Sequence, residues 1–259
     1  MFGWVKGVPY LASLDQPDFV FEDISDLAPF RRLQGAGAST PGAAVFAGLD
    51  MGEAKAEDNN ELGQFIRSNQ CVAFFGGTTT NTVPVAMFSD FACPICRVMD
   101  DRLTDLEESD PGSFQIIRHQ LPLLGVASAT ASRAVLAADL QGRYRDMHAR
   151  LIRTPVVTDE SYVAAIAESL DIDAARLCAD MQSDAIDTRL STSAAIADVF
   201  GFYGTPAFAV GRTVFMGLMD SRSLKKLIDA EKENPCMAAY NSLQGSNLNK
   251  KHDTTWLQT

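Results

Sequence analysis

Two cysteines separated by two residues, Cys93 and Cys96, constrain this chain more than any other feature. They follow an apolar run of strand length, residues 83–88, and they open a segment, residues 94–107, that we expect to be helical. Cysteines three positions apart at a helix start lie on neighbouring positions, close enough to form a disulfide. The pair therefore lies where a strand passes into a helix, and the rest of the chain is interpreted around that point.

The segments that follow predict an alternating α/β order. A turn at residues 111–112 leads to a strand over 114–119, and the Ala-rich stretch 126–200 predicts three to five helices. Residues 207–210 and 213–216 predict a hairpin with a two-residue turn, and a helix over 221–231 closes the core. Strand–helix–strand favours a parallel pair with a right-handed crossover, and the hairpin adds antiparallel strands. The fold class is α/β, a mixed sheet covered by helices with a helical insertion.

Residues 1–80 differ from the rest in being rich in Gly, Pro, Asn and Thr. They predict an irregular, loop-rich extension with loops over 34–42 and 52–60, the second of them acidic and mobile, and a short helix at 61–70. The first ten residues lack the charged and apolar regions of a secretory signal, and no apolar run of about 20 residues predicts a membrane-spanning helix. The formal net charge of −11 argues against nucleic acid or an anionic membrane as a partner.

The position of the pair predicts thiol chemistry. Cys93 would lie at the helix N-terminus, where unpaired backbone N–H groups and the helix dipole stabilise a thiolate. A thiolate is the attacking species in disulfide exchange, so a lowered pKa makes Cys93 the nucleophile. Cys96, one turn further into the helix, is expected to be more buried and to resolve the mixed disulfide. Pro94 suits the first helical turn, where its missing N–H is not needed.

Half of a structural zinc site is the main alternative interpretation of the pair. Such a site needs two further ligands, whereas Cys71, Cys178 and Cys236 each stand alone in the sequence. We therefore expect redox chemistry, with no metal and no organic cofactor. A structural disulfide between Cys71 and Cys236 stays open as one interpretation, and Cys178 is then the cysteine expected to remain unpaired. His119 is interpreted as a structural histidine, and residues 100–102 as a solvated helix face.

Four segments, occurring in order, resemble the DsbA-like branch of the thioredoxin superfamily. They are FSDFACPIC at residues 88–96, HQLPL at 119–123, QGRY at 141–144 after an Ala-rich helix, and GTPAF at 204–208. The resemblance covers residues 83–232 and implies a thioredoxin-like fold. It divides the chain into an N-terminal extension (1–80), a core (81–125 and 201–233), a helical insertion (126–200) and a polar tail (234–259). It also implies that Pro206 is a cis-proline lying against the cysteine pair, with Thr205 pairing with the substrate chain.

One position departs from the wider superfamily. Many thioredoxin-like proteins carry a buried acid six residues before the first cysteine, and this chain has Met87 there. Asp90, three residues before Cys93, is the candidate replacement for proton transfer at the second cysteine. The competing interpretation, which we favour, is that Asp90 caps the helix start or the preceding turn.

The resemblance implies a thiol–disulfide oxidoreductase acting on protein thiols in the bacterial periplasm, with Pro94 and Ile95 tuning the redox poise and Thr205 and Pro206 shaping the substrate groove. Substrate proteins and a redox partner protein are the expected partners, and we favour a monomer. Thr205 and Asp90 also resemble the dimeric DsbC/DsbG isomerase and reductase group, which is the first alternative. A metal-binding or redox-inactive thioredoxin-fold module is the second.

Overall fold

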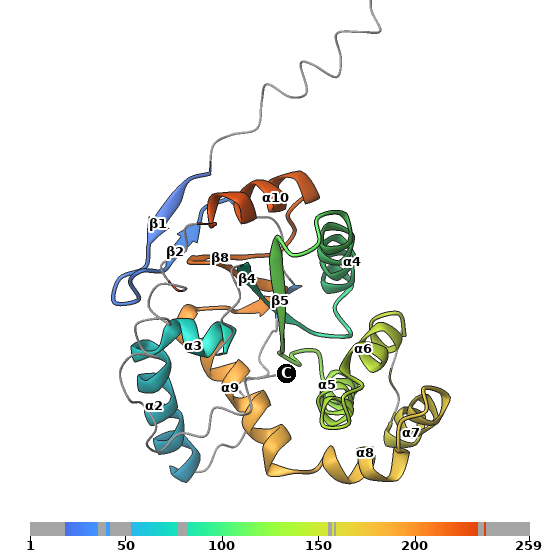
Figure 1. Ribbon diagram of the computed structural model, residues 1–259. Helices are drawn as coiled ribbons and strands as arrows, with labels where there is room; N and C mark the ends of the chain where they lie inside the picture. Colours follow the sequence, from blue (N-terminus) through green and yellow to red (C-terminus); the bar gives the residue numbers. More distant parts are fainter. Residues whose placement is uncertain are drawn as a thin grey trace, which may run out of the picture.

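The computed structural model of the protein describes residues 19–35, 40–41, 53–76, 82–154, 157, 159–232 and 236. Our expectations for residues 1–18 and for the tail from residue 237 onward lie outside these described residues. A six-stranded sheet organises the chain (Figure 1). Its strands, in spatial order, are β1 (Phe21–Asp23), β2 (Arg31–Leu33), β8 (Thr213–Met216), β7 (Ala207–Val210), β4 (Val83–Ser89) and β5 (Phe114–Gln120).

The sheet is mixed, as the sequence predicts. β4 pairs parallel with β5 and antiparallel with β7, which in turn forms the predicted hairpin with β8. β2 joins the far edge parallel to β8, and β1 pairs antiparallel with β2. A second, two-stranded pairing joins β3 (Thr40–Pro41) to β6 (Gly204–Thr205).

Helices cover both faces of the sheet (Figure 1). On one face lie α4 (Pro94–Ser109) and α10 (Ser221–Ala230), and on the other lie α2 (Glu53–Ser68), α3 (Gln70–Phe75) and the C-terminal part of α9 (Asp184–Phe200). The remaining helices pack together around a core of their own. They are α5 (Val126–Asp139), α6 (Tyr144–Ile152), α7 (Glu160–Ser169) and α8 (Ala174–Asp180).

β4 shows why both faces are covered. Successive side chains of a strand point to opposite faces. Val85 and Met87 lie in the cluster beneath α4 and α10, whereas Ala86 and Phe88 lie in the cluster beneath α3 and α9. Every residue of β4 is buried, which fits the uninterrupted apolar run over residues 83–88 rather than an alternating pattern.

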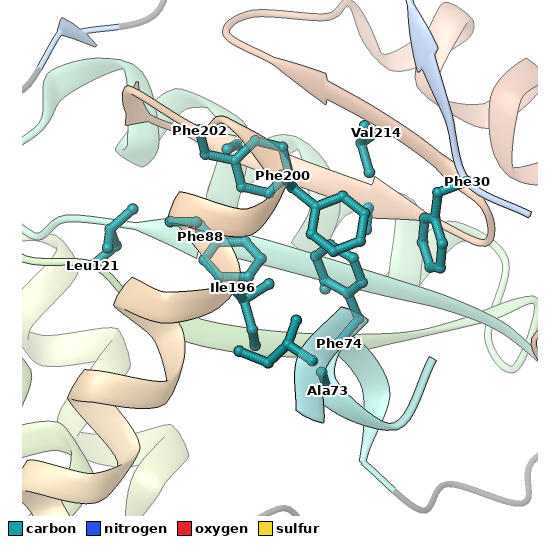
Figure 2. Close-up of a cluster of buried hydrophobic side chains, with 14 of the residues drawn as sticks. Phe30, Ala73, Phe74, Phe88, Leu121, Ile196, Phe200, Phe202 and Val214 are labelled. Carbon is teal, nitrogen blue, oxygen red and sulfur yellow. The ribbon is translucent and has the colours of Figure 1, made fainter. Parts of the chain in front are cut away.

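An aromatic cluster fills the second face. In Figure 2, Phe88 from the sheet lies in one cluster with Phe200 at the end of α9, Phe202 just after α9, and Phe74 from α3. The Phe74 ring lies 4.5 Å from that of Phe200 and 5.1 Å from that of Phe30. Phe30 comes from the extension, so this cluster joins the extension to the core.

The extension is more ordered than the sequence predicts. β1 and β2 extend the sheet, and α2 begins at Glu53, so the loop expected over residues 52–60 is wrong. A run of strong helix formers, EAKAE at 53–57, accounts for the helix. The two strands have three residues each and depend on a partner strand far away in sequence, which short apolar runs do not reveal.

The described residues of the stretch 126–200 contain five helices, at the upper end of the predicted number. α9 begins near the helical group and ends on the sheet, where Ile196 and Phe200 join the aromatic cluster. The predicted division into domains stays a prediction. No helix among the described residues has the length and apolar character needed to cross a membrane.

Candidate active site

Cys93 and Cys96 lie where β4 passes into α4. β4 ends at Ser89, a short turn follows, and α4 begins at Pro94, as its fixed φ favours. Cys93 is the N-cap of the helix, and its sulfur accepts a hydrogen bond from the backbone N–H of Cys96 at 3.3 Å. Both cysteines are fully buried and lie in one apolar cluster with Met87. Pro94 is exposed, and Ile95 packs half-buried against the same cluster.

The second part of the site comes from the other end of the chain. The Thr205–Pro206 peptide bond is cis, and both residues are buried. The Cys93 thiol donates to the backbone carbonyl oxygen of Thr205 at 3.5 Å. The Pro206 carbonyl accepts from the Gly217 N–H at 2.8 Å, which ties this segment to the end of β8. The structure thus brings together four of the predicted site residues: Cys93, Cys96, Thr205 and Pro206.

The two sulfurs have different surroundings. Burial raises the pKa of the Cys96 thiol strongly, and the neighbouring Cys93 raises it further. Desolvation disfavours a charged sulfur, so Cys96 stays a thiol under ordinary conditions. Cys93 instead receives a backbone N–H at the N-terminus of a helix, where partial positive charge gathers. The site is therefore chemically asymmetric.

Asp90 lies fully buried at the turn before Cys93 and satisfies four donors. One carboxylate oxygen accepts from the Ala92 N–H at 2.8 Å and from the Ser128 hydroxyl at 2.6 Å. The other accepts from the N–H groups of Leu123 and Leu124 at 2.7 and 2.9 Å. The carboxylate thus clamps the cysteine-bearing turn to the loop before α5. This geometry favours the capping interpretation over a proton-transfer role.

Met87 is buried in the cysteine cluster, at the position where the wider superfamily carries an acid. Its thioether cannot take up a proton, so the fold supplies no carboxylate from that strand. Proton transfer at Cys96 must then come from another group or from solvent that reaches the opened site.

A buried polar group behind the site was missed by the sequence analysis. Asp100, interpreted there as part of a solvated helix face, is 6% exposed, so that interpretation is wrong for this residue. Its carboxylate accepts from Arg118 Nε on β5 at 2.9 Å and lies 3.7 Å from His148 Nε2 on α6. Asp100 lies four residues after Cys96, hence on the same helix face, and that spacing was the available signal.

His119 is the buried structural histidine that its sequence context favoured. Its ring stacks on Phe88 at 4.4 Å, and its two nitrogens face the Phe74 carbonyl at 2.9 Å and the Ser193 hydroxyl at 3.3 Å. Burial lowers the pKa of His119 to about 4. Neutral and fully partnered, it is poorly suited to act as an acid or base at the cysteines.

The other cysteines lie apart from the pair. Cys71 of α3 forms a disulfide with Cys236, with Cα atoms 5.3 Å apart, and Cys236 is buried in the aromatic cluster. Cys178, on α8, is a half-buried thiol. Among the described residues, no three His, Cys, Asp or Glu side chains gather as a metal site would require.

A thioredoxin-like fold with two cysteines at the N-terminus of its first core helix, facing a cis-proline, defines a thiol–disulfide oxidoreductase. The sequence profile of the DSBA-like thioredoxin domain matches residues 84–229, more than half of the chain. The chain therefore belongs to this family, as its sequence motifs indicate.

Solved structures share this fold. A thioredoxin-like oxidoreductase from Silicibacter pomeroyi DSS-3 is 28% identical, with a TM-score of 0.58 over 62% of this chain and 97% of that one. The thiol-disulfide exchange protein alpha-DsbA2 from Wolbachia pipientis is 22% identical, with a TM-score of 0.57 over 67% and 97%. The catalytic domain of Proteus mirabilis ScsC is also 22% identical, with a TM-score of 0.57 over 66% and 99%. No curated protein matches the chain in a sequence comparison.

Proposed function

We propose that the protein exchanges disulfides with substrate proteins through Cys93 and Cys96. In the oxidising direction, a substrate thiolate attacks Cys93 of the Cys93–Cys96 disulfide. The S–S bond breaks, and Cys96 leaves with the electron pair. A second substrate thiolate then attacks the substrate sulfur of the mixed disulfide, so the substrate is oxidised and Cys93 leaves as a thiolate. Two electrons pass from the substrate to the pair, and the reducing direction runs the same steps backwards.

The observation that carries this proposal is the asymmetry of the pair. The Cys93 sulfur receives the Cys96 N–H and touches the Thr205 carbonyl, whereas burial holds Cys96 as a thiol. Cys93, a good nucleophile and leaving group, thus lies beside Cys96, which stays protonated until it is needed to resolve the mixed disulfide. Pro94 and Ile95, lying between the two sulfurs in sequence, are proposed to tune the reduction potential.

Trapping of the mixed disulfide tests the proposal. The Cys96→Ala variant keeps Cys93 but has no thiol to resolve the intermediate, so it should accumulate adducts with an oxidised protein substrate on non-reducing gels. Cys93→Ala should give none, and Cys178→Ala, which removes a thiol remote from the site, should behave like the parent. Equal adducts in the Cys93→Ala variant, or none in Cys96→Ala, would contradict the assignment.

An isomerase or reductase role of the DsbC/DsbG kind is the second candidate, favoured by Thr205 before the cis-proline and by Asp90. The reduction potential and the rescue of a scrambled disulfide protein separate the two. A potential near that of strong oxidants with poor rescue supports the oxidase, and efficient rescue supports the isomerase. Light scattering tests the accompanying expectation, a monomer for the oxidase and a dimer for the isomerase.

We propose a periplasmic location, where a redox partner protein would regenerate the pair. The Cys71–Cys236 disulfide supports it, since structural disulfides persist in oxidising compartments. Among the structural neighbours, one from Salmonella enterica serovar Typhimurium is described as a periplasmic thioredoxin-like protein. Fractionation of cells that express the native gene tests the location.

A further inference from the structure

The extension reaches the active site through β3. Thr40 and Pro41 pair antiparallel with β6, in a register that sets Thr40 opposite Thr205 and Pro41 opposite Gly204. This two-stranded pairing is separate from the main sheet. A segment of the chain's own N-terminal part therefore occupies the backbone edge that immediately precedes Pro206.

That edge is next to the reacting sulfur. The Thr205 carbonyl oxygen lies 3.5 Å from the Cys93 sulfur, so a strand paired with Thr205 runs alongside Cys93. A strand edge recognises an extended peptide through main-chain hydrogen bonds, which do not depend on the peptide's sequence. A substrate chain that presents a sulfur to Cys93 and pairs with β6 would need the place that β3 fills.

We propose that residues 40–41 act as an intramolecular competitor of substrate, covering the β6 edge until an extended polypeptide displaces them. This inference rests on the function proposed above, because the competitor matters only if Cys93 reacts with polypeptides. The ligand of the β6 edge is an extended polypeptide segment that runs antiparallel to β6. Either the protein's own residues 40–41 or a substrate supplies this segment.

The geometry around β3 suits reversible pairing with the β6 edge. β2 ends at Leu33, seven residues before Thr40, and is held in the main sheet by β8. A short tether of this kind gives the segment an effective concentration in the millimolar range. The paired strands are only two residues long, so few cross-strand contacts hold β3 in place, and each of them contributes little to stability. A longer substrate strand can therefore replace β3.

Disulfide trapping tests whether β3 lies beside Cys93. Thr40→Cys is made in a chain that also carries Cys96→Ala and Cys178→Ala, and the protein is equilibrated with oxidised and reduced glutathione. The Cys93 thiolate first attacks oxidised glutathione, forming a mixed disulfide with one glutathione and releasing the other. The introduced thiolate then attacks the Cys93 sulfur and releases the bound glutathione. Two protein thiols are thereby oxidised, and one oxidised glutathione is reduced.

Val20→Cys in the same background is the matched control, because Val20 also belongs to the extension and is exposed. Peptide mapping identifies the products. The intramolecular bond from position 40 to Cys93 should form with an effective concentration about 100-fold above that of the control. Equal values for the two positions would overturn the proposed contact.

Rates of disulfide exchange test whether residues 40–41 compete with substrate for the β6 edge. The double variant Thr40→Gly/Pro41→Gly weakens strand pairing, because glycine loses more conformational freedom than threonine or proline when the strand forms. Its oxidised form should react about fivefold faster with a reduced, unfolded polypeptide than the parent does. Reduced glutathione is too small a substrate to need the β6 edge, so the rate of its reaction should stay unchanged. Val20→Gly should match the parent in both assays.

The outcomes separate the two proposals. If both substrates react with the parent and the polypeptide rate does not rise in the double variant, the competitor is overturned while the exchange function stands. If both rates rise equally, the segment merely shields the sulfur, and strand competition is again overturned. If Cys93 reacts with neither substrate, the proposed function fails and the competitor fails with it.

Discussion

The Cys93 thiol touches the backbone carbonyl oxygen of Thr205, at 3.5 Å, across a separation of 112 residues in the chain. Cys93 belongs to the first βα unit of the core and Thr205 to the segment that enters the final hairpin. The helical group and α9 lie between them in sequence, so the site forms only when the two parts of the core are paired in one sheet. Main-chain recognition and sulfur chemistry meet at this contact.

Alkylation kinetics should show the asymmetry of the pair. Iodoacetamide reacts with thiolates, so its rate follows the deprotonated fraction. In the Cys96→Ala variant, Cys93 should titrate with a pKa below about 8.5, the ordinary value. In the Cys93→Ala variant, burial still raises the pKa of Cys96, so that thiol should stay unreactive up to pH 9. A Cys93 pKa at or above the ordinary value would contradict the activated-thiolate argument.

Replacing Asp90 with asparagine should destabilise the protein. The amide nitrogen cannot accept, so two of the four donors that Asp90 now satisfies lose their acceptor. A buried unsatisfied donor costs about 1–3 kcal/mol, so we expect a loss of about 3 kcal/mol in the free energy of unfolding, measured by urea titration.

Ser128→Ala is the control for this prediction. It removes one donor and leaves the Asp90 carboxylate three others, so it should cost about 1.5 kcal/mol. A loss below about 0.5 kcal/mol in Asp90→Asn would mean that the clamp is not needed to hold the turn.

Two buried histidines should make stability fall in mild acid. Burial lowers the pKa of His119 and of His148 to about 4, and for His148 Arg118 adds to the shift while Asp100 opposes it. The unfolded value is near 6.5, so below pH 6.5 the unfolded state binds more protons and unfolding becomes easier. The stability that depends on keeping both histidines neutral is therefore fully present above pH 6.5 and is lost as the pH falls toward 4.

We expect each histidine to remove roughly 1.5 kcal/mol between pH 6.5 and 5, measured by urea unfolding at fixed pH. His148→Gln should remove about half of this pH dependence, whatever its effect at pH 7. A free energy of unfolding that stays constant across the window would show that neither histidine is held neutral by burial.

The parts of the fold that sequence predicts well are local. The passage from strand to helix at Cys93, the hairpin and the Ala-rich helices depend on neighbouring residues, and the structure contains them all. β1, β2 and β3 escaped prediction because strands of two or three residues are held by partners far away in sequence. Burial of Asp100 depends on Arg118 and on helix α6, which no local pattern places beside it.

Removing the Cys71–Cys236 disulfide should lower stability without affecting the exchange reaction. The bond closes a separation of 165 residues, and losing such a constraint typically costs about 2–4 kcal/mol. The Cys71→Ala/Cys236→Ala variant should therefore melt at a lower temperature, whereas Cys178→Ala should melt within about 1 °C of the parent. Adduct formation in the Cys96→Ala background should persist, because Cys236 and the active-site pair lie in different clusters.

The extension should depend on one buried ion pair. Arg31 of β2 donates to the Glu231 carboxylate, just after α10, at 2.8 Å, and the Thr213 hydroxyl donates to the same oxygen at 2.7 Å. Glu231 is 2% exposed. Its other oxygen accepts the Arg212 N–H at 3.1 Å and lies 3.9 Å from Arg212 Nε, so losing Arg31 leaves a buried charge with only this more distant cation. Arg31→Met should cost about 3–5 kcal/mol, measured by urea unfolding.

A double-mutant cycle separates the ion pair from the packing of Arg31 over the Phe21 ring, 3.5 Å away. Glu231→Gln added to Arg31→Met removes the weakly compensated charge and should recover at least about 1.5 kcal/mol, because a neutral amide is less costly to bury than a carboxylate that has lost its short ion pair. Hydrogen exchange in β1 and β2 should quicken in Arg31→Met and slow again in the double variant. If the two losses simply add, packing rather than charge holds the extension to the sheet.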